Sequence, residues 1–375
     1  TTTGASIMKD VESLSRGILY WRSFSHWLGG MGVLVFLLAV VPEGTRNTGF
    51  TLHLLRAESP GPEVGKLTPR MRESAMVLYL LYILLTAINI LFLRLGNMPW
   101  FDSFCTAFGT AGTGGFGIKN DSMASYSPYL QNVCTVFMFL FGVNFNCYYL
   151  LCLRQFRSVF KDEELRLYFG TVAGSIALIS WNLRGAYPTL RETVRHAAFQ
   201  VSSIITTTGF ATTNFDNWPS FSKAILLSLM VIGACAGSTG GGLKVVRVLI
   251  LFKSTVRNLL QLLHPQEVHV IRVNGRPLSE KVVANTNTYL AVYTIILTFS
   301  FIVLSLDGFS LTSNFSAVLA CFNNIGPGLE IVGPASNYSA YSDLSKGVLI
   351  FDMLAGRLEL FPILALFVPR TWMRH

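Results

Sequence analysis

The strongest constraint on the fold of this chain is a series of apolar stretches long enough, or nearly so, to cross a lipid bilayer as helices. They cover residues 19–41, 74–93, 130–153, 165–181, 222–236, 244–263, 286–306 and 345–368. A hydrocarbon layer about 30 Å thick needs roughly 20 residues of α-helix. Because 51% of the residues are hydrophobic and only 13% are charged, the sequence predicts an all-α integral membrane protein.

The Lys and Arg residues indicate how these helices are oriented. Most of the 29 lie in the connections 42–72, 153–166 and 243–285, or after residue 368. Since positive charge accumulates in cytoplasmic loops, we expect these segments inside the cell and the other connections outside. The sequence has no basic patch with interleaved aromatic residues, so the net charge of +9 does not indicate nucleic-acid binding.

A short glycine-centred motif recurs four times between the apolar stretches. It reads TTTGAS at 1–6, AGTGGF at 111–116, TTTGFA at 206–211 and NNIGPG at 323–328, with Gly4, Gly114, Gly209 and Gly326 as the matching glycines. Each complete copy follows an apolar span and a shorter amphipathic stretch, and precedes a second span. The sequence therefore predicts four pseudo-repeats of helix, re-entrant pore helix, filter loop and helix around one pore.

We expect the repeats to divide the chain in order. Residues 1–41 are the filter and second helix of repeat 1, whose first helix and pore helix are expected upstream of Thr1. The other parts are a cytoplasmic linker (42–72), repeat 2 (73–153), repeat 3 (165–263), a second cytoplasmic linker (264–285), repeat 4 (286–368) and a cytoplasmic tail (369–375).

The four motifs are predicted to bind a cation. Non-helical backbone at the depth of a bilayer is tolerated only where it is buried in protein or lines an aqueous path. Four loops around one axis would direct carbonyl oxygens at a common centre, where a dehydrated cation replaces the missing hydrogen-bond donors. A single such glycine is as consistent with a turn between packed helices, but four equivalent copies favour a filter. The predicted ion-binding residues are Thr2, Thr3, Gly4, Ala5, Thr113, Gly114, Gly115, Thr207, Thr208, Gly209, Phe210, Asn324, Ile325, Gly326 and Pro327.

A glycine-rich stretch is predicted to form a gate. It interrupts an apolar run from 222 to 263 and consists of Gly237, Ser238, Thr239, Gly240, Gly241 and Gly242. Each glycine lowers helix stability by roughly 1 kcal/mol. We therefore expect a loop across the pore beneath the filter, followed by Lys244 on the cytoplasmic side. A passive kink is the alternative.

Charged residues in two apolar spans are also notable. Arg357 lies within the last span, where a permanent charge costs roughly 2.5 kcal/mol or more. It is predicted to lie in the pore below the filter as part of the gate, with Glu359 and Asp352 as nearby acids. The alternative is a buried ion pair that braces two helices. Arg22 and His26 lie near the outer end of the first span with Trp21 and Trp27 beside them. Anchoring at the membrane interface by these aromatic residues explains the group better than a proton relay.

Several longer strings resemble a known family. LYWRSFSHWLGGMGVLVF (19–36), GACAGSTGGGLKVVR (233–247) and MLAGRLELFP (353–362), together with the four motifs, are similar to the Trk, Ktr and HKT superfamily of potassium transporters, in particular its bacterial TrkH and TrkG type. The resemblance covers essentially the whole chain. In this superfamily a glycine in the first filter, as at Gly4, accompanies a preference for potassium.

The resemblance implies a membrane subunit, not an enzyme, that takes up K⁺ through its filter carbonyls across the bacterial cytoplasmic (inner) membrane. It also implies a homodimer with a TrkA-like cytoplasmic regulatory subunit. NAD or ATP/ADP is then expected on that partner only, and no cofactor in this chain.

Two other functions are kept open at this point. An ion-coupled secondary transporter of a small solute predicts inverted repeats with a site in mid-membrane, whereas these units share one orientation. An intramembrane enzyme needs polar groups that converge within the bilayer. The apolar spans offer mainly Asp352, Arg357 and Glu359, all in one helix.

Overall fold

The computed structural model describes residues 1–30, 32, 71–267, 269–358 and 360–367. The predicted linker 42–72, apart from its last two residues, lies outside the described residues. The predicted tail 369–375 and the part of the first span after residue 32 also lie outside them.

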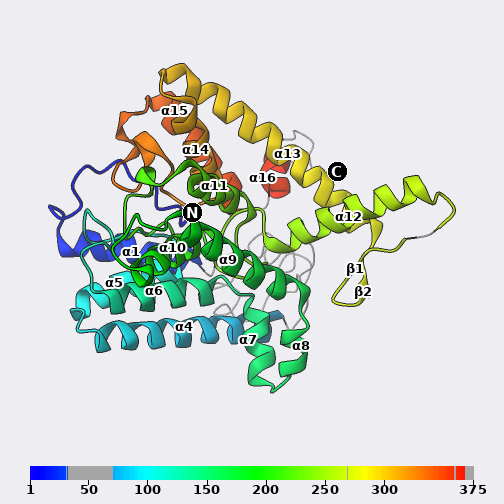
Figure 1. Cartoon of the computed structure of the whole chain (residues 1–375), viewed down its shortest axis with the longest axis horizontal. Coiled ribbons are helices and arrows are strands. Elements are labelled where there is room, and N and C mark those ends of the chain that lie inside the picture. The colour runs from blue at the N-terminus through cyan, green and yellow to red at the C-terminus, as the bar shows by residue number, and fades with distance from the viewer. Residues whose placement is uncertain (31, 33–70, 268, 359, 368–375) are drawn as a thin grey trace.

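Nearly all regular structure in the described residues is helical (Figure 1). The α-helices are α1 (Arg16–Gly30), α4 (Met71–Leu95), α5 (Trp100–Ala111), α6 (Pro128–Phe141), α7 (Phe145–Cys152), α8 (Phe156–Phe160), α9 (Glu163–Asn182), α10 (Leu190–Ile205), α11 (Ser220–Ile232), α12 (Val245–Leu263), α13 (Glu280–Leu304), α14 (Leu311–Phe322), α15 (Asp343–Arg357) and α16 (Leu360–Leu366). Short 3₁₀ turns are η1 (Phe215–Asn217), η2 (Ser305–Asp307), η3 (Glu330–Val332) and η4 (Tyr338–Ala340). Strands β1 (Arg272–Val273) and β2 (Arg276–Pro277) pair as one antiparallel hairpin.

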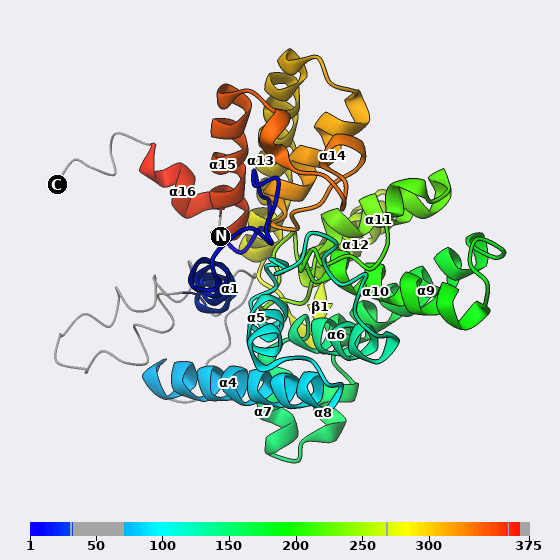
Figure 2. The same ribbon diagram turned by 90° about the vertical axis from the view of Figure 1, so that its left-hand side faces the viewer.

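The helices form repeated units around a common centre. The middle helix packs against both of its neighbours in α4–α5–α6, in α9–α10–α11 and in α13–α14–α15, while α1 packs on α5. Figure 2 shows α1 on the left, α4–α6 below, α9–α11 on the right and α13–α15 above. The chain thus passes round the centre in sequence order. The predicted architecture, an all-α membrane fold of four pseudo-repeats, is confirmed.

The short helices of the units are the predicted re-entrant helices. Helices α5, α10 and α14 contain 12, 16 and 12 residues, which is too short to cross a bilayer. Side chains cap the N-termini of α10 and α14. Thr189 Oγ1 accepts a hydrogen bond from Glu192 N (3.2 Å), and Ser310 Oγ accepts one from Ser313 N (3.1 Å). Their other ends lead directly into the glycine motifs.

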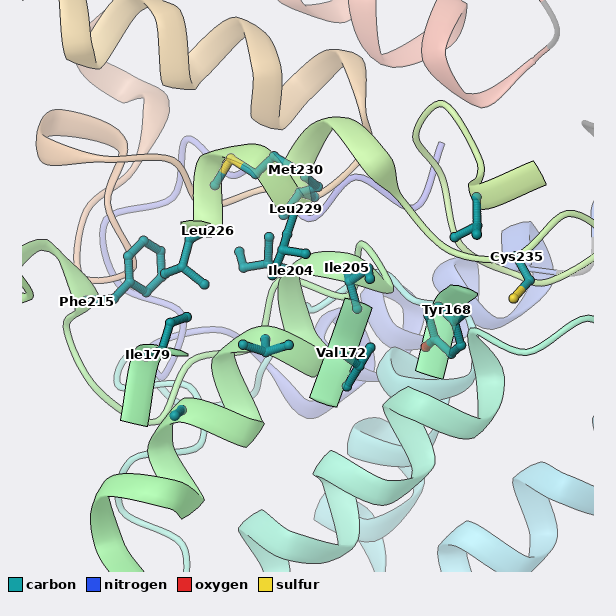
Figure 3. Close-up of a cluster of buried hydrophobic side chains, with 14 of the residues drawn as sticks. Tyr168, Val172, Ile179, Ile204, Ile205, Phe215, Leu226, Leu229, Met230 and Cys235 are labelled. Atoms are coloured by element: carbon teal, nitrogen blue, oxygen red, sulfur yellow. The ribbon is translucent and has the colours of Figure 1, made fainter. Parts of the chain in front are cut away.

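A large hydrophobic cluster of the described residues is centred on the third unit. Figure 3 shows Ile204 and Ile205 of α10 between side chains of α9, such as Val172, and side chains of α11, such as Leu229 and Met230. The short helix is therefore held by its own unit and, on another side, by α6 of the second unit. Burial of this kind fixes the position at which α10 ends.

The described helices differ in how well they could span a membrane. Two of them, Ala75–Leu95 and Glu280–Asp307 (with its 3₁₀ end), are long and apolar enough by length and composition. The predicted span 130–153 is not one straight helix, because α6 and α7 meet at 89°. Gly142 ends α6, and the Asn144 side chain caps the N-terminus of α7. The apolar composition of 130–153 hides this bend, since α7 is as apolar as a true span.

Candidate functional site

Four non-helical loops, one from each repeat, meet at the centre of the structure. In each loop a glycine α-carbon lies so close to a carbonyl oxygen of the next loop that no side chain fits. Gly4 faces the oxygen of Gly114, Gly115 that of Thr208, Gly209 that of Ile325, and Gly326 that of Thr3. The contacts pass from the first loop to the second, third and fourth and back to the first. We call the oxygens of Thr3, Gly114, Thr208 and Ile325 the carbonyl ring.

One backbone conformation recurs in all four loops. A left-handed residue comes first, namely Thr2 (φ 55°), Thr113 (47°), Thr207 (58°) or Asn324 (56°). A left-handed glycine follows two residues later, namely Gly4 (φ 77°), Gly115 (70°), Gly209 (81°) or Gly326 (98°). Both the available space and the φ angle therefore require glycine at this position.

This register corrects the sequence-based match of the second motif. The glycine equivalent to Gly4, Gly209 and Gly326 is Gly115, and Gly114 instead supplies a ring oxygen. The match was wrong by one residue because GTGGF contains two adjacent glycines. Only the φ angles distinguish them.

The three pore helices hold their loops by the same hydrogen bond. The N–H of each of these ring residues donates to a carbonyl of the preceding helix. Gly114 donates to Gly109 O (2.9 Å), Thr208 to Ser203 O (2.8 Å) and Ile325 to Ala320 O (2.8 Å). Within the described residues no donor reaches the four ring oxygens, although Thr3, Thr208 and Ile325 are at most 2% exposed. A buried carbonyl without a donor is costly. The ring is therefore suited to a cation.

The surroundings of the ring favour positive charge. The C-terminal ends of α5, α10 and α14 lead into it, and the C-terminus of a helix carries a partial negative charge. Across the described part of the chain, no group of three or more His, Cys, Asp or Glu side chains could hold a metal ion.

A cavity of about 190 Å³ adjoins the ring and is lined by Gly4, Gly115, Gly209 and Gly326, one glycine from each loop. Lys9, Arg22 and Lys119 also line it. The cavity touches all four repeats. It is thus placed as the entrance to the ring.

Polar contacts join the repeats around this entrance. Asn120 in repeat 2 binds Asp10 (Nδ2 to Oδ1, 2.8 Å) in the loop after the first motif, and Glu330 N in repeat 4 donates to Asp216 Oδ1 (2.9 Å) in repeat 3. Burial raises the pKa of Asp216. Hydrogen bonds from serine hydroxyls lower the pKa of Glu330.

The glycine-rich stretch 237–242 is a loop that contacts the filter loops directly. Helix α11 ends at Ile232 and α12 begins at Val245. Thr113 Oγ1 donates to Thr239 O (2.8 Å), and Gly241 N donates to Thr207 Oγ1 (2.6 Å). The threonine hydroxyls of two filter loops are therefore bonded to this loop.

Arg357 and Lys244 hold the same loop from the other side. Arg357 donates to Thr239 O (2.8 Å), to Gly30 O (3.0 Å) and to Gly29 O, so it joins the loop to α1. Lys244 is fully buried and its Nζ donates to Gly240 O. Of the two acids suggested as partners of Arg357, Asp352 accepts from Ser300 Oγ (2.8 Å), and Glu359 lies outside the described residues.

The remaining predicted filter residues flank the ring. Phe210 is buried in the core of repeats 2 and 3, and its carbonyl accepts from Ser203 Oγ (2.6 Å). Ala5 packs on the core of repeat 4. The Pro327 ring lies beside the α-carbon of Gly209. These side chains support the loops.

His26 and Arg22 have a different position from the one predicted. His26 is 5% exposed and its ring lies directly behind Gly114. It stacks on Phe116 with the ring centroids 4.1 Å apart, and the Arg22 guanidinium lies 4.2 Å from the same Phe116 ring. The prediction that this part of the helix lies at the membrane interface is wrong for His26, which faces the filter. The aromatic residues beside it in the sequence concealed this position. The i, i+4 spacing of the pair was the available signal.

Comparisons with known proteins agree on one family. The family described as "TrkH: Cation transport protein" matches residues 1–172 and 186–373. The chain is 37% identical over 378 residues to the Trk system potassium uptake proteins TrkH of Salmonella typhimurium and Escherichia coli (strain K12), covering 99% of this chain and 77% of each of them. It is 34% identical to the Trk system potassium uptake protein TrkG of Escherichia coli, covering 99% and 76%.

A solved structure is similar over the same range. The crystal structure of the potassium transporter TrkH from Vibrio parahaemolyticus aligns with a TM-score of 0.86 at 33% identity, covering 99% of this chain and 76% of that one.

The ring register can be tested by glycine substitutions. We expect potassium to raise the melting temperature of the purified protein, because a ligand that binds only the folded state stabilises it. Gly115→Ala should abolish this shift, since a methyl group there would meet the Thr208 carbonyl. Gly117→Ala is the matched control, because the nearest atom to its added methyl group is 3.5 Å away. An equal potassium shift in both variants would contradict the ring.

Proposed function

Because this chain belongs to the TrkH family of cation transport proteins, we propose that it takes up potassium across the cytoplasmic membrane through the carbonyl ring. The observation that carries the proposal is the closed ring of four buried oxygens that no donor among the described residues reaches. Such oxygens replace the hydration shell of a dehydrated monovalent cation.

In this proposal the filter consists of the residues named from the sequence, with different roles. The ring oxygens of Thr3, Gly114, Thr208 and Ile325 bind the ion, and the left-handed glycines allow the loops to approach. The hydroxyls of Thr113 and Thr207 bond to the loop 237–242. The ion enters from the cavity that all four glycines line.

We further propose that the loop 237–242 is the gate. Its contacts with Thr113 and Thr207 place it against the filter. Arg357 adds a fixed positive charge at the same place, which disfavours a cation there. Opening then requires the bonds from Arg357 and the threonines to the loop to break.

The names of the relatives refer to a Trk system, that is, to a protein with other subunits. We propose a homodimer with a TrkA-like cytoplasmic subunit that binds NAD or ATP/ADP. The basic connections 153–166 and 243–285 would face that subunit. The filter loops would face the outside. The repeat boundaries predicted from the sequence are part of the same proposal.

Uptake of radioactive rubidium into potassium-loaded liposomes tests the transport function. External potassium should compete with rubidium, and lithium should not, because the ring oxygens match a larger dehydrated ion. Liposomes without protein provide the background. If lithium competes as well as potassium, or no uptake occurs even after residues 237–242 are deleted, the potassium pore is wrong and a solute transporter is the next hypothesis.

The role of Arg357 can be tested separately. Arg357→Ala should raise the rubidium uptake rate several-fold, because the loop loses its bonds to Arg357 and the path loses a positive charge. Arg257→Ala is the control, since Arg257 pairs with Glu280 on the surface. Unchanged uptake together with poor folding would instead show that Arg357 only braces the helices.

A further inference from the structure

Three consecutive acids at the start of α9 contact the segments on both sides of the loop 237–242. We call Asp162, Glu163 and Glu164 the α9 acidic triplet. Glu164 is 6% exposed, and its Oε1 accepts a hydrogen bond from Ala236 N (2.6 Å). Ala236 directly precedes the loop. One end of the loop is therefore fixed to α9.

The other two acids hold the hairpin that follows α12. Asn274, at the hairpin turn, donates from Nδ2 to Asp162 Oδ2 (2.7 Å) and from its N–H to Glu163 Oε1 (3.2 Å). Its Oδ1 accepts from Glu163 N (2.8 Å). Asn274 has φ 53° and is followed by Gly275 with φ 76°, a turn in which both residues are left-handed.

Helix α12 connects these two attachments. It begins directly after the loop and ends before the hairpin, and Figure 1 shows α12 and the hairpin extending together from the body. Lys253 of α12 binds the Glu163 carboxylate and the Arg272 carbonyl (2.7 Å to the latter). Ile250 of α12 packs against Ile271 beside the hairpin. The loop, α12 and the hairpin are thus fastened to α9 at three points.

We propose that the α9 acidic triplet is a latch that keeps the loop 237–242 against the filter, with Glu164 and Asn274 as positioning residues. The loop is continuous with α12, so it leaves the filter only if α12 moves. α12 moves only if the hairpin releases Asp162 and Glu163. Displacing the hairpin from the cytoplasmic side therefore opens the gate. This inference depends on the proposed role of the loop.

The test uses the full-length protein in liposomes, with single-channel open probability and hydrogen exchange of residues 236–242 as readouts. Asn274→Gly removes the side chain but keeps the left-handed turn, and Glu164→Leu removes the acceptor. Each should raise the open probability about tenfold or more, the effect of losing a hydrogen bond to a charged group. Glu164→Gln keeps a carbonyl acceptor and should restore a value near the wild type. Asp343→Asn is the control, because Asp343 is exposed and pairs with Lys346 of its own helix α15.

The same variants in protein lacking residues 237–242 separate a latch from general damage. There Asn274→Gly and Glu164→Leu should leave the open probability unchanged, because the loop they position is missing. The latch would be overturned if these variants raised the open probability equally with and without the loop. It would also be overturned if they did not raise it in the protein that retains the loop.

Hydrogen exchange separates failure of the latch from failure of the transport proposal. If potassium is conducted neither by the protein with the loop nor by the protein lacking residues 237–242, the transport proposal fails. The latch is then supported if Asn274→Gly speeds exchange at 236–242, and overturned if it does not.

Discussion

The structure depends on four buried carbonyl oxygens that accept no hydrogen bond from the described part of the chain. Backbone oxygens in that state are unfavourable unless something replaces water, and only a closed arrangement around one axis lets a single cation do so. The ring is possible because each loop brings a bare glycine α-carbon against the carbonyl of its neighbour. Three short helices end at the ring, and a carbonyl of each accepts the same hydrogen bond from an N–H of its loop. The repeats are therefore arranged around the ring.

The side chains around the ring fall into two groups. His26, Phe116 and Phe210 pack behind the loops and fix their positions. Thr113, Thr207 and Arg357 instead bond to the loop 237–242. In the proposed function, the first group affects which ion fits and the second affects whether the path is open. Because the threonines belong to the filter loops and contact the loop 237–242, the same proposal couples binding of an ion to movement of the loop.

Much of the fold was readable from the sequence, because apolar length and a recurring motif are local signals. The re-entrant helices and the break at 237–242 follow from helix length and glycine content. The remaining features depend on contacts between distant residues. The equivalence of Gly115 needed φ angles, the bend between α6 and α7 is concealed by uniform hydrophobicity, and Arg357 binds backbone carbonyls that no residue pattern reveals. Glu164 resembled an ordinary N-terminal helix acid, although it is buried against Ala236.

The most direct test of the ring is to locate the ion. Crystals of the protein grown in rubidium should show an anomalous scattering peak on the axis between the oxygens of Thr3, Gly114, Thr208 and Ile325. With rubidium kept constant, excess potassium should remove the peak and excess lithium should leave it in place, because a small ion cannot contact all four oxygens of a ring that fits potassium. A peak only outside the ring, or no peak within it at saturating rubidium, would contradict the account.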